Sequence, residues 1–154
     1  MNQKILDFYL KGGPDHAGRR LSDIIALTDK ELELIHDYIQ WLLPTKTGSA
    51  FNEDAPLLDA ETIAALKANP AFDIIFPMCA QVMLDFWKKN DHWRKKDDHN
   101  LLRMTRFMES CTLLGHQKCA NELWNYLIGL SKTPQGKFIT KSNFEFWRGA
   151  LQSK

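Results

Sequence analysis

The sequence lacks the features of membrane, secreted and zinc-dependent proteins. None of its apolar runs approaches the length of a membrane-spanning helix. The first ten residues lack the apolar core and small-residue cleavage site of a signal peptide. The three cysteines are odd in number and form no Cys-x-x-Cys pair, which disfavours a disulfide framework and a structural zinc site. We therefore expect a cytoplasmic protein with reduced thiols and no membrane span.

The sequence also has no large excess of positive or negative charge. Twenty Lys or Arg residues face 19 Asp or Glu residues, so the formal net charge is +1 and no overall positive field favours nucleic acid. The basic segment 88–98 is interleaved with aspartates and carries no base-stacking aromatic pattern. Nucleic acid is thus a disfavoured partner, and this segment is interpreted as a solvated connection.

The sequence does contain hydrophobic spacing typical of helices, and no segment alternates like a β-strand. We predict an all-α, compact bundle of about six or seven helices, which 154 residues can build as a single domain over 1–154. A short helix is predicted over 23–27 with Ser22 as its cap, and Ser142 with Glu145 is predicted to cap the last helix. The main predicted helices are 2–10, 28–44, 60–68, 72–86, 98–114, 116–130 and 143–151.

The segment 28–44 is predicted to be the helix around which the others pack. Thr28 and Glu31 form a capping box at its start, and Pro44 closes its other end. Its apolar residues fill about half of the helical wheel. The other half carries the polar residues Glu33, His36, Asp37 and Gln40.

A second polar strip lies on the predicted helix 98–114. Its apolar borders predict partial burial, and buried guanidinium groups need partners. In the structural interpretation, which we favour, Glu33 and Asp37 neutralise its arginines and fix how the two helices cross. In the functional interpretation, the arginines bind an anion such as a peptide carboxylate or a phosphate. The strip consists of His99, Arg103, Arg106 and Ser110.

Motifs for metal binding and nucleophilic catalysis are missing. The sequence contains no His-x-x-x-His and no Gly-x-Ser-x-Gly. The glycine-rich segment 12–18 lacks the spacing of a phosphate-binding loop, so we predict a surface turn there. We expect no metal and no cofactor.

Several motifs, in order along the chain, resemble the opioid growth factor receptor conserved region. The central one is HDYIQWLLP over 36–44. The resemblance covers about residues 5–150. The other matching segments are PDHAGR over 14–19, LSDI over 21–24, SAFNEDAPL over 49–57, MLDFW over 83–87 and HNLLRMTRFM over 99–108.

This resemblance implies a helical globular module related to bacterial members of the family. The animal member is described as a receptor for an enkephalin-type opioid peptide, associated with the nucleus and with negative control of growth. Bacterial relatives have no established role.

Taken together, these observations predict a non-enzymatic peptide- or protein-binding module. The predicted site is the groove between the two polar strips, with the loop around residue 51 nearby, and a small anion is an alternative ligand. The competing prediction is an enzyme acting on a small anionic substrate, with His36 or His99 as general acid–base. The predicted site residues are His36, Asp37, Gln40, Phe51, Asn52, His99, Arg103 and Arg106.

Overall fold

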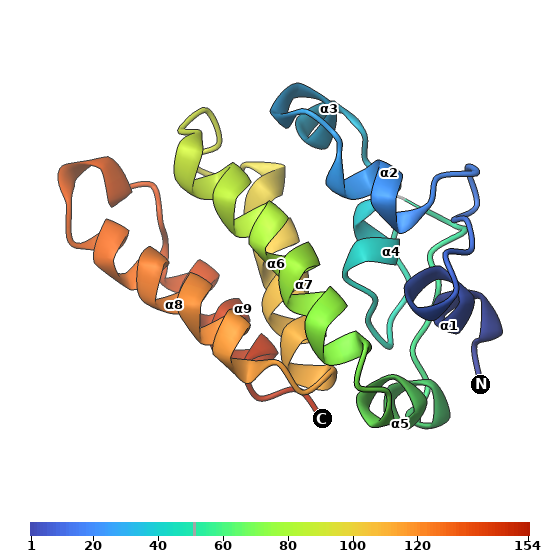
Figure 1. The fold of residues 1–154 in the computed structure, drawn as a ribbon. Coiled ribbons are helices and arrows are strands. Elements are labelled where there is room, and N and C mark those ends of the chain that lie inside the picture. Colours follow the sequence, from blue (N-terminus) through green and yellow to red (C-terminus); the bar gives the residue numbers. More distant parts are fainter. Residues whose placement is uncertain (51) are drawn as a thin grey trace. The chain divides into compact units, whose positions relative to one another are not determined.

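The computed structural model describes residues 1–50 and 52–154, and these are mainly helical (Figure 1). They form nine α-helices and one 3₁₀ helix. The only β contacts among them are two isolated bridges, Thr45 with Leu57 and Ser49 with Asn52. The predicted all-α fold is confirmed, with more and shorter helices than the six or seven expected.

The chain divides into two compact units, residues 1–82 and 83–154. The prediction of a single domain over 1–154 stays a prediction. The first unit holds α1 (Gln3–Leu10), α2 (Leu21–Ile25), α3 (Asp29–Leu34), α4 (Ile39–Leu42), α5 (Ala60–Ala68) and the first part of α6 (Phe72–Lys89). The second holds the end of α6, α7 (His99–Leu113), α8 (Gln117–Ser131), η1 (Pro134–Gly136) and α9 (Lys141–Ala150).

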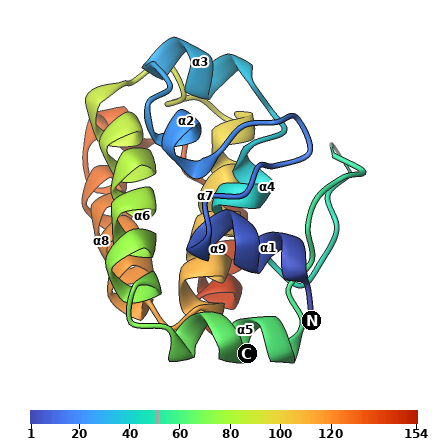
Figure 2. The same cartoon turned by 45° about the vertical axis from the view of Figure 1, so that its right-hand side comes forward.

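An aromatic core holds the first unit together. The ring of Tyr9 lies edge-on to Phe72, with centroids 5.3 Å apart, and its hydroxyl donates a hydrogen bond to the carbonyl of Leu42. Phe8 contacts Trp41 at a centroid distance of 5.5 Å. These contacts tie α1 to α4 and to the start of α6. The long connection between α4 and α5 runs beside α1 (Figure 2).

The predicted helix 28–44 is wrong in its middle, because the chain leaves the helical path between α3 and α4. Ile35 has an extended backbone, with ψ of 127°. Tyr38 is buried, and its hydroxyl donates to the carbonyl of Leu32 at 2.6 Å. This hydrogen bond satisfies one of the carbonyls that the end of α3 leaves without a helical partner. The apolar half of the helical wheel over 28–44 predicted that its residues would be buried, but Leu34 is 63 % exposed.

Two predicted helix caps are also wrong by a residue or more. α2 includes Ser22, because the carboxylate of Asp23 accepts a hydrogen bond from the backbone N–H one position before the helix. α9 includes Ser142, because Thr140 and Asn143 cap that helix reciprocally. In both places, cap-forming side chains occur close together in sequence, so the pattern alone does not choose between adjacent starts.

The second unit is built on α7, which packs against α8 and α9 (Figure 1). Trp87 is fully buried, and its ring lies edge-on to Phe107 at 5.5 Å. Its indole N–H donates to the side-chain oxygen of Asn100 at 3.1 Å. The indole of Trp147 on α9 donates to the carbonyl of Leu101. Each of these indoles thus combines an apolar contact with a satisfied donor.

Two glycines of the second unit predict opposite responses to alanine. A Cβ at Gly136 would lie 1.9 Å from the carbonyl oxygen of Leu130, so the backbone would have to move. We expect Gly136→Ala to lower the free energy of unfolding by about 1–3 kcal/mol. Gly129 lies within α8 with no atom within 4 Å of a built Cβ, and Gly129→Ala should raise it by about 0.5–1 kcal/mol. Urea unfolding of both variants measures the difference; equal effects would contradict the geometry.

Candidate functional site

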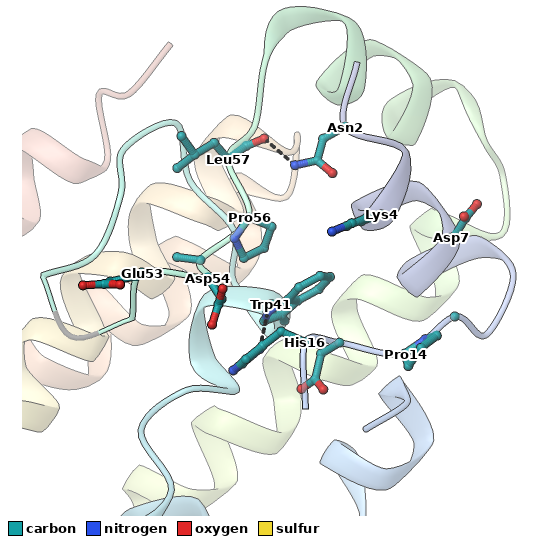
Figure 3. A pocket seen from close by; sticks show the side chains of 13 residues that line it. Asn2, Lys4, Asp7, Pro14, His16, Trp41, Glu53, Asp54, Pro56 and Leu57 are labelled. Carbon is teal, nitrogen blue, oxygen red and sulfur yellow. Dashed lines mark hydrogen bonds between the residues drawn. The ribbon is translucent and has the colours of Figure 1, made fainter. Parts of the chain in front are cut away.

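A hollow of about 640 Å³ opens in the first unit (Figure 3). α1 forms one wall, and the segment 53–57 forms the wall opposite. Trp41 of α4 lies at its base, beside His16 from the loop that follows α1. Its volume is within the range of ligand-binding pockets. We call it the first hollow.

The imidazole of His16 is held through both ring nitrogens. The indole N–H of Trp41 can only donate, and it lies 3.0 Å from Nδ1 of His16, which must therefore accept. The proton of the neutral ring is then on Nε2, which lies 3.0 Å from Oδ2 of Asp37. The two rings also stack, with an interplanar angle of 16°. His16 thereby joins the loop 12–18 to α4.

Arg19 links the carboxylates of Asp15 and Asp37. Its Nε lies 2.7 Å from Oδ2 of Asp15, and its Nη1 lies 2.8 Å from Oδ1 of Asp37. The side chain of Asp15 is fully buried, and its Oδ1 accepts the backbone N–H groups of Ala17 and Arg19. We call Asp15, His16, Arg19, Asp37 and Trp41 the His16 cluster.

In the His16 cluster, the ionic contacts together shift the pKa values of Arg19 and Asp37 more than burial does. Burial alone would lower the pKa of Arg19, but the hydrogen bonds and charges of Asp15 and Asp37 raise it above its usual value. Burial alone would raise the pKa of Asp37, but Arg19 and, to a lesser extent, His16 lower it. Both groups are therefore held in their charged forms.

The lowered pKa of Asp37 predicts a loss of stability in acid. A carboxylate with a depressed folded-state pKa stabilises the fold fully above its unfolded value of 3.8, and this contribution disappears as the pH falls through the folded value. We expect Asp37→Asn to melt below the wild type at neutral pH, and the two melting temperatures to converge as the pH falls through the folded-state pKa of Asp37. Thermal melts between pH 2 and pH 7 measure this gap; a gap independent of pH would contradict it. Glu53→Gln, at an exposed carboxylate, is the control.

Three of the predicted site residues, Asp37, Gln40 and Asn52, come together in the first unit. The side-chain nitrogen of Asn52 donates to Oε1 of Gln40 at 3.1 Å and to the backbone carbonyl of Asp37 at 3.3 Å. Gln40 and Asn52 are both buried, so they hold the loop 45–58 against α4. His36 is exposed in the break between α3 and α4, and Phe51 lies outside the described residues.

The other three predicted residues belong to the second unit. Arg103 is buried and Arg106 is partly exposed, as expected of a strip with apolar borders. Burial lowers the pKa of Arg106, and the nearby Glu109 only partly offsets this. The side chain of His99 is 42 % exposed and lies 3.8 Å from Asp98. The groove that would join this strip to residues of the first unit stays a prediction.

The residue pattern of the sequence did not predict the His16 cluster. Asp37 was expected to pair with arginines of the helix 98–114, whereas its contacts in the first unit are with Arg19 and His16. The glycine content of the loop 12–18 indicated only a surface turn. The available signal was Asp15 followed by Ala17 and Arg19, because an aspartate often accepts backbone N–H groups two or more positions ahead.

The described part of the chain contains no grouped metal ligands and no single helix that could cross a membrane. Within residues 1–50 and 52–154, no three His, Cys, Asp or Glu side chains are grouped so that they could hold a metal ion. No single described helix has both the length and the apolar character to cross a membrane. Only α5 and α6 taken together meet those criteria, with a bend of 105° between them.

Comparison with known proteins identifies part of the chain. Residues 24–92 match the model of the family described as the opioid growth factor receptor (OGFr) conserved region. The resemblance predicted from the motifs is confirmed over these residues, which include Asp37, Gln40, Trp41 and Asn52. No curated protein and no solved structure matches the chain.

Proposed function

We propose that this chain, whose residues 24–92 carry the OGFr conserved region, is a non-enzymatic module that binds a peptide or protein partner through the first hollow. The observation that carries the proposal is a concave surface whose base is fixed by internal hydrogen bonds. A preformed pocket of this kind loses little conformational freedom when it is filled.

The bonding of His16 favours binding over catalysis. A general acid or base needs a nitrogen within hydrogen-bond reach of the substrate. Both nitrogens of His16 are engaged within the His16 cluster, by Trp41 and Asp37. His36 and His99, the candidates for acid–base chemistry, are not among the residues that line the first hollow. The chemistry of the hollow therefore suits recognition.

The apolar lining suits an inserted side chain of a partner. Pro14 and Pro56 stand on either side of the base formed by Trp41 (Figure 3). Leu57 is 44 % exposed. A partner that covers it would remove its apolar surface from contact with water, which favours binding. Such anchors usually dominate the affinity of protein interfaces.

Filling the first hollow tests this proposal. A random heptapeptide library displayed on phage is selected on the wild-type chain. The enriched peptides are then titrated against Ala55→Trp, which places an indole on the lining, and against Ala71→Trp, which adds the same bulk at an exposed position outside the hollow. We expect Ala55→Trp to abolish binding and Ala71→Trp to preserve it. Failure to enrich any peptide, or equal binding to both variants, would overturn the proposal.

A further inference from the structure

A second hollow of about 550 Å³ adjoins the first. Asn2, Lys4 and Leu57 line both of them. A hydrogen bond crosses between the two walls there, from the side-chain nitrogen of Asn2 to the carbonyl oxygen of Leu57 at 3.2 Å (Figure 3). The two hollows therefore lie next to each other on the same face. The hydrogen bond between Asn2 and Leu57 separates them, and we call it the bar.

The charges along this face are separated by sign. Lys4 projects from α1 toward the first hollow, and Asp54 projects from the opposite wall toward Trp41 (Figure 3). Among the described residues, no hydrogen bond or ion pair engages the side chain of Lys4, Glu53 or Asp54. Their charges are therefore available to a ligand, and they stand on opposite walls.

The remaining carboxylates at the first hollow are already compensated. Asp7 accepts a hydrogen bond from Gln3 and pairs with Lys11, and it points away from the hollow in Figure 3. Asp15 is neutralised by Arg19. Among the described carboxylates, Asp54 is thus the one that faces the first hollow without a cation, on the wall opposite Lys4, whereas the side chain of Glu53 points away from the hollow in Figure 3.

The second hollow has a different set of charged groups. Lys4 and Lys46 line it, together with Met1. Its one carboxylate belongs to Asp59, which accepts hydrogen bonds from the backbone N–H and the hydroxyl of Thr62 and lies 3.0 Å from the amino group of Met1. Among the described residues, Lys4 is thus the charged side chain at this hollow that no hydrogen bond or ion pair engages.

We propose that the two hollows form one groove for an extended, internal segment of a partner protein with two oppositely charged side chains. A basic side chain lies in the first hollow against Asp54. An acidic side chain lies on the other side of the bar, against Lys4. This inference rests on the proposed function and adds the charge pattern of the ligand. Because a hollow lies on each side of the bar, the segment passes the bar instead of ending at it.

Blocked peptides and a charge-swapped protein test this inference. Three acetylated and amidated heptapeptides have a central leucine and carry Lys before and Glu after it, the reverse order, or Gln at both positions. A fourth is the Gln peptide with free ends. Each is titrated by calorimetry into the wild type, the double variant Lys4→Glu/Asp54→Lys, and the control Lys30→Glu/Asp73→Lys. The control makes the same two exchanges at exposed residues outside both hollows.

We expect the wild type to bind one charged order at least about tenfold more tightly than the other order or the neutral peptide, because like charges placed together cost affinity. The charge-swapped variant should reverse this preference, and the control should keep it. Equal binding of the neutral peptide, or a preference that survives the swap, would overturn the inference, as would preferential binding of the peptide with free ends.

These failures are distinguishable from failure of the proposed function. If library peptides still require the open first hollow while charge has no effect, the binding function stands and the charge pattern is wrong. If none of the four peptides binds a wild-type chain that does bind library peptides, the charge pattern is wrong as well.

Discussion

Trp41→Ala is expected to lower the free energy of unfolding by about 3–5 kcal/mol, the range measured for removing a buried large aromatic side chain. Trp41 is only 3 % exposed, contacts Phe8 edge-on and stacks on His16. For a chain of this length, such a loss shifts the melting temperature by roughly 10–15 °C. Thermal and urea unfolding measure it, and a loss below 1 kcal/mol would contradict the packing role of this residue.

Trp41→Phe separates packing from hydrogen bonding. Phenylalanine keeps most of the ring contact but removes the indole N–H that donates to Nδ1 of His16. We expect a smaller loss of about 1–2 kcal/mol, which reflects a partly buried acceptor left without its partner. If both variants lose the same stability, the hydrogen bond to His16 is the main contribution and ring packing is secondary.

Arg19→Met is expected to cost about 3 kcal/mol, because it leaves the buried carboxylate of Asp15 without its cation. The side chain of Asp15 is fully buried and Arg19 is its only ion-pair partner among the described residues. Methionine retains much of the aliphatic length of arginine, so the loss reports the charge more than the packing. Urea unfolding at neutral pH measures it.

A double-mutant cycle with Asp15→Asn is the control for that prediction. Asparagine keeps the acceptor oxygen for the N–H groups of Ala17 and Arg19 but removes the buried charge. The double variant should therefore be more stable than the sum of the two single losses predicts. Additive losses would show that Arg19 and Asp15 contribute independently, and that the geometry overstates their coupling.

Hydrophobic spacing predicted the longer helices well. The periodic patterns of α5, α6, α7 and α8 extend over at least two turns, and Asp59 and Asp98 cap α5 and α7. The break between α3 and α4 could not be predicted in this way. It depends on contacts with residues distant in sequence, such as those of Asp37 with Arg19 and His16, which outweigh the local helical preference.

The candidate site was less predictable than the fold. Asp37 and Gln40 were selected for their polarity, and Asn52 because its loop was expected nearby. The three meet in space, but Gln40 and Asn52 turn out to support a loop. His16 and Trp41 come from segments assigned to a surface turn and to the core. Their hydrogen bond requires the loop conformation, which Gly12 and Gly18 allow by adopting positive φ angles.

The alternation of signs in the His16 cluster constrains how this sequence can change over evolutionary time. Asp15, Arg19 and Asp37 follow one another as negative, positive and negative groups, so a replacement at Arg19 leaves both neighbours uncompensated. A neutral replacement there becomes tolerable only once the fully buried carboxylate of Asp15 has been exchanged first. Among related sequences, the two positions should therefore vary together, with the acidic residue lost before the basic one.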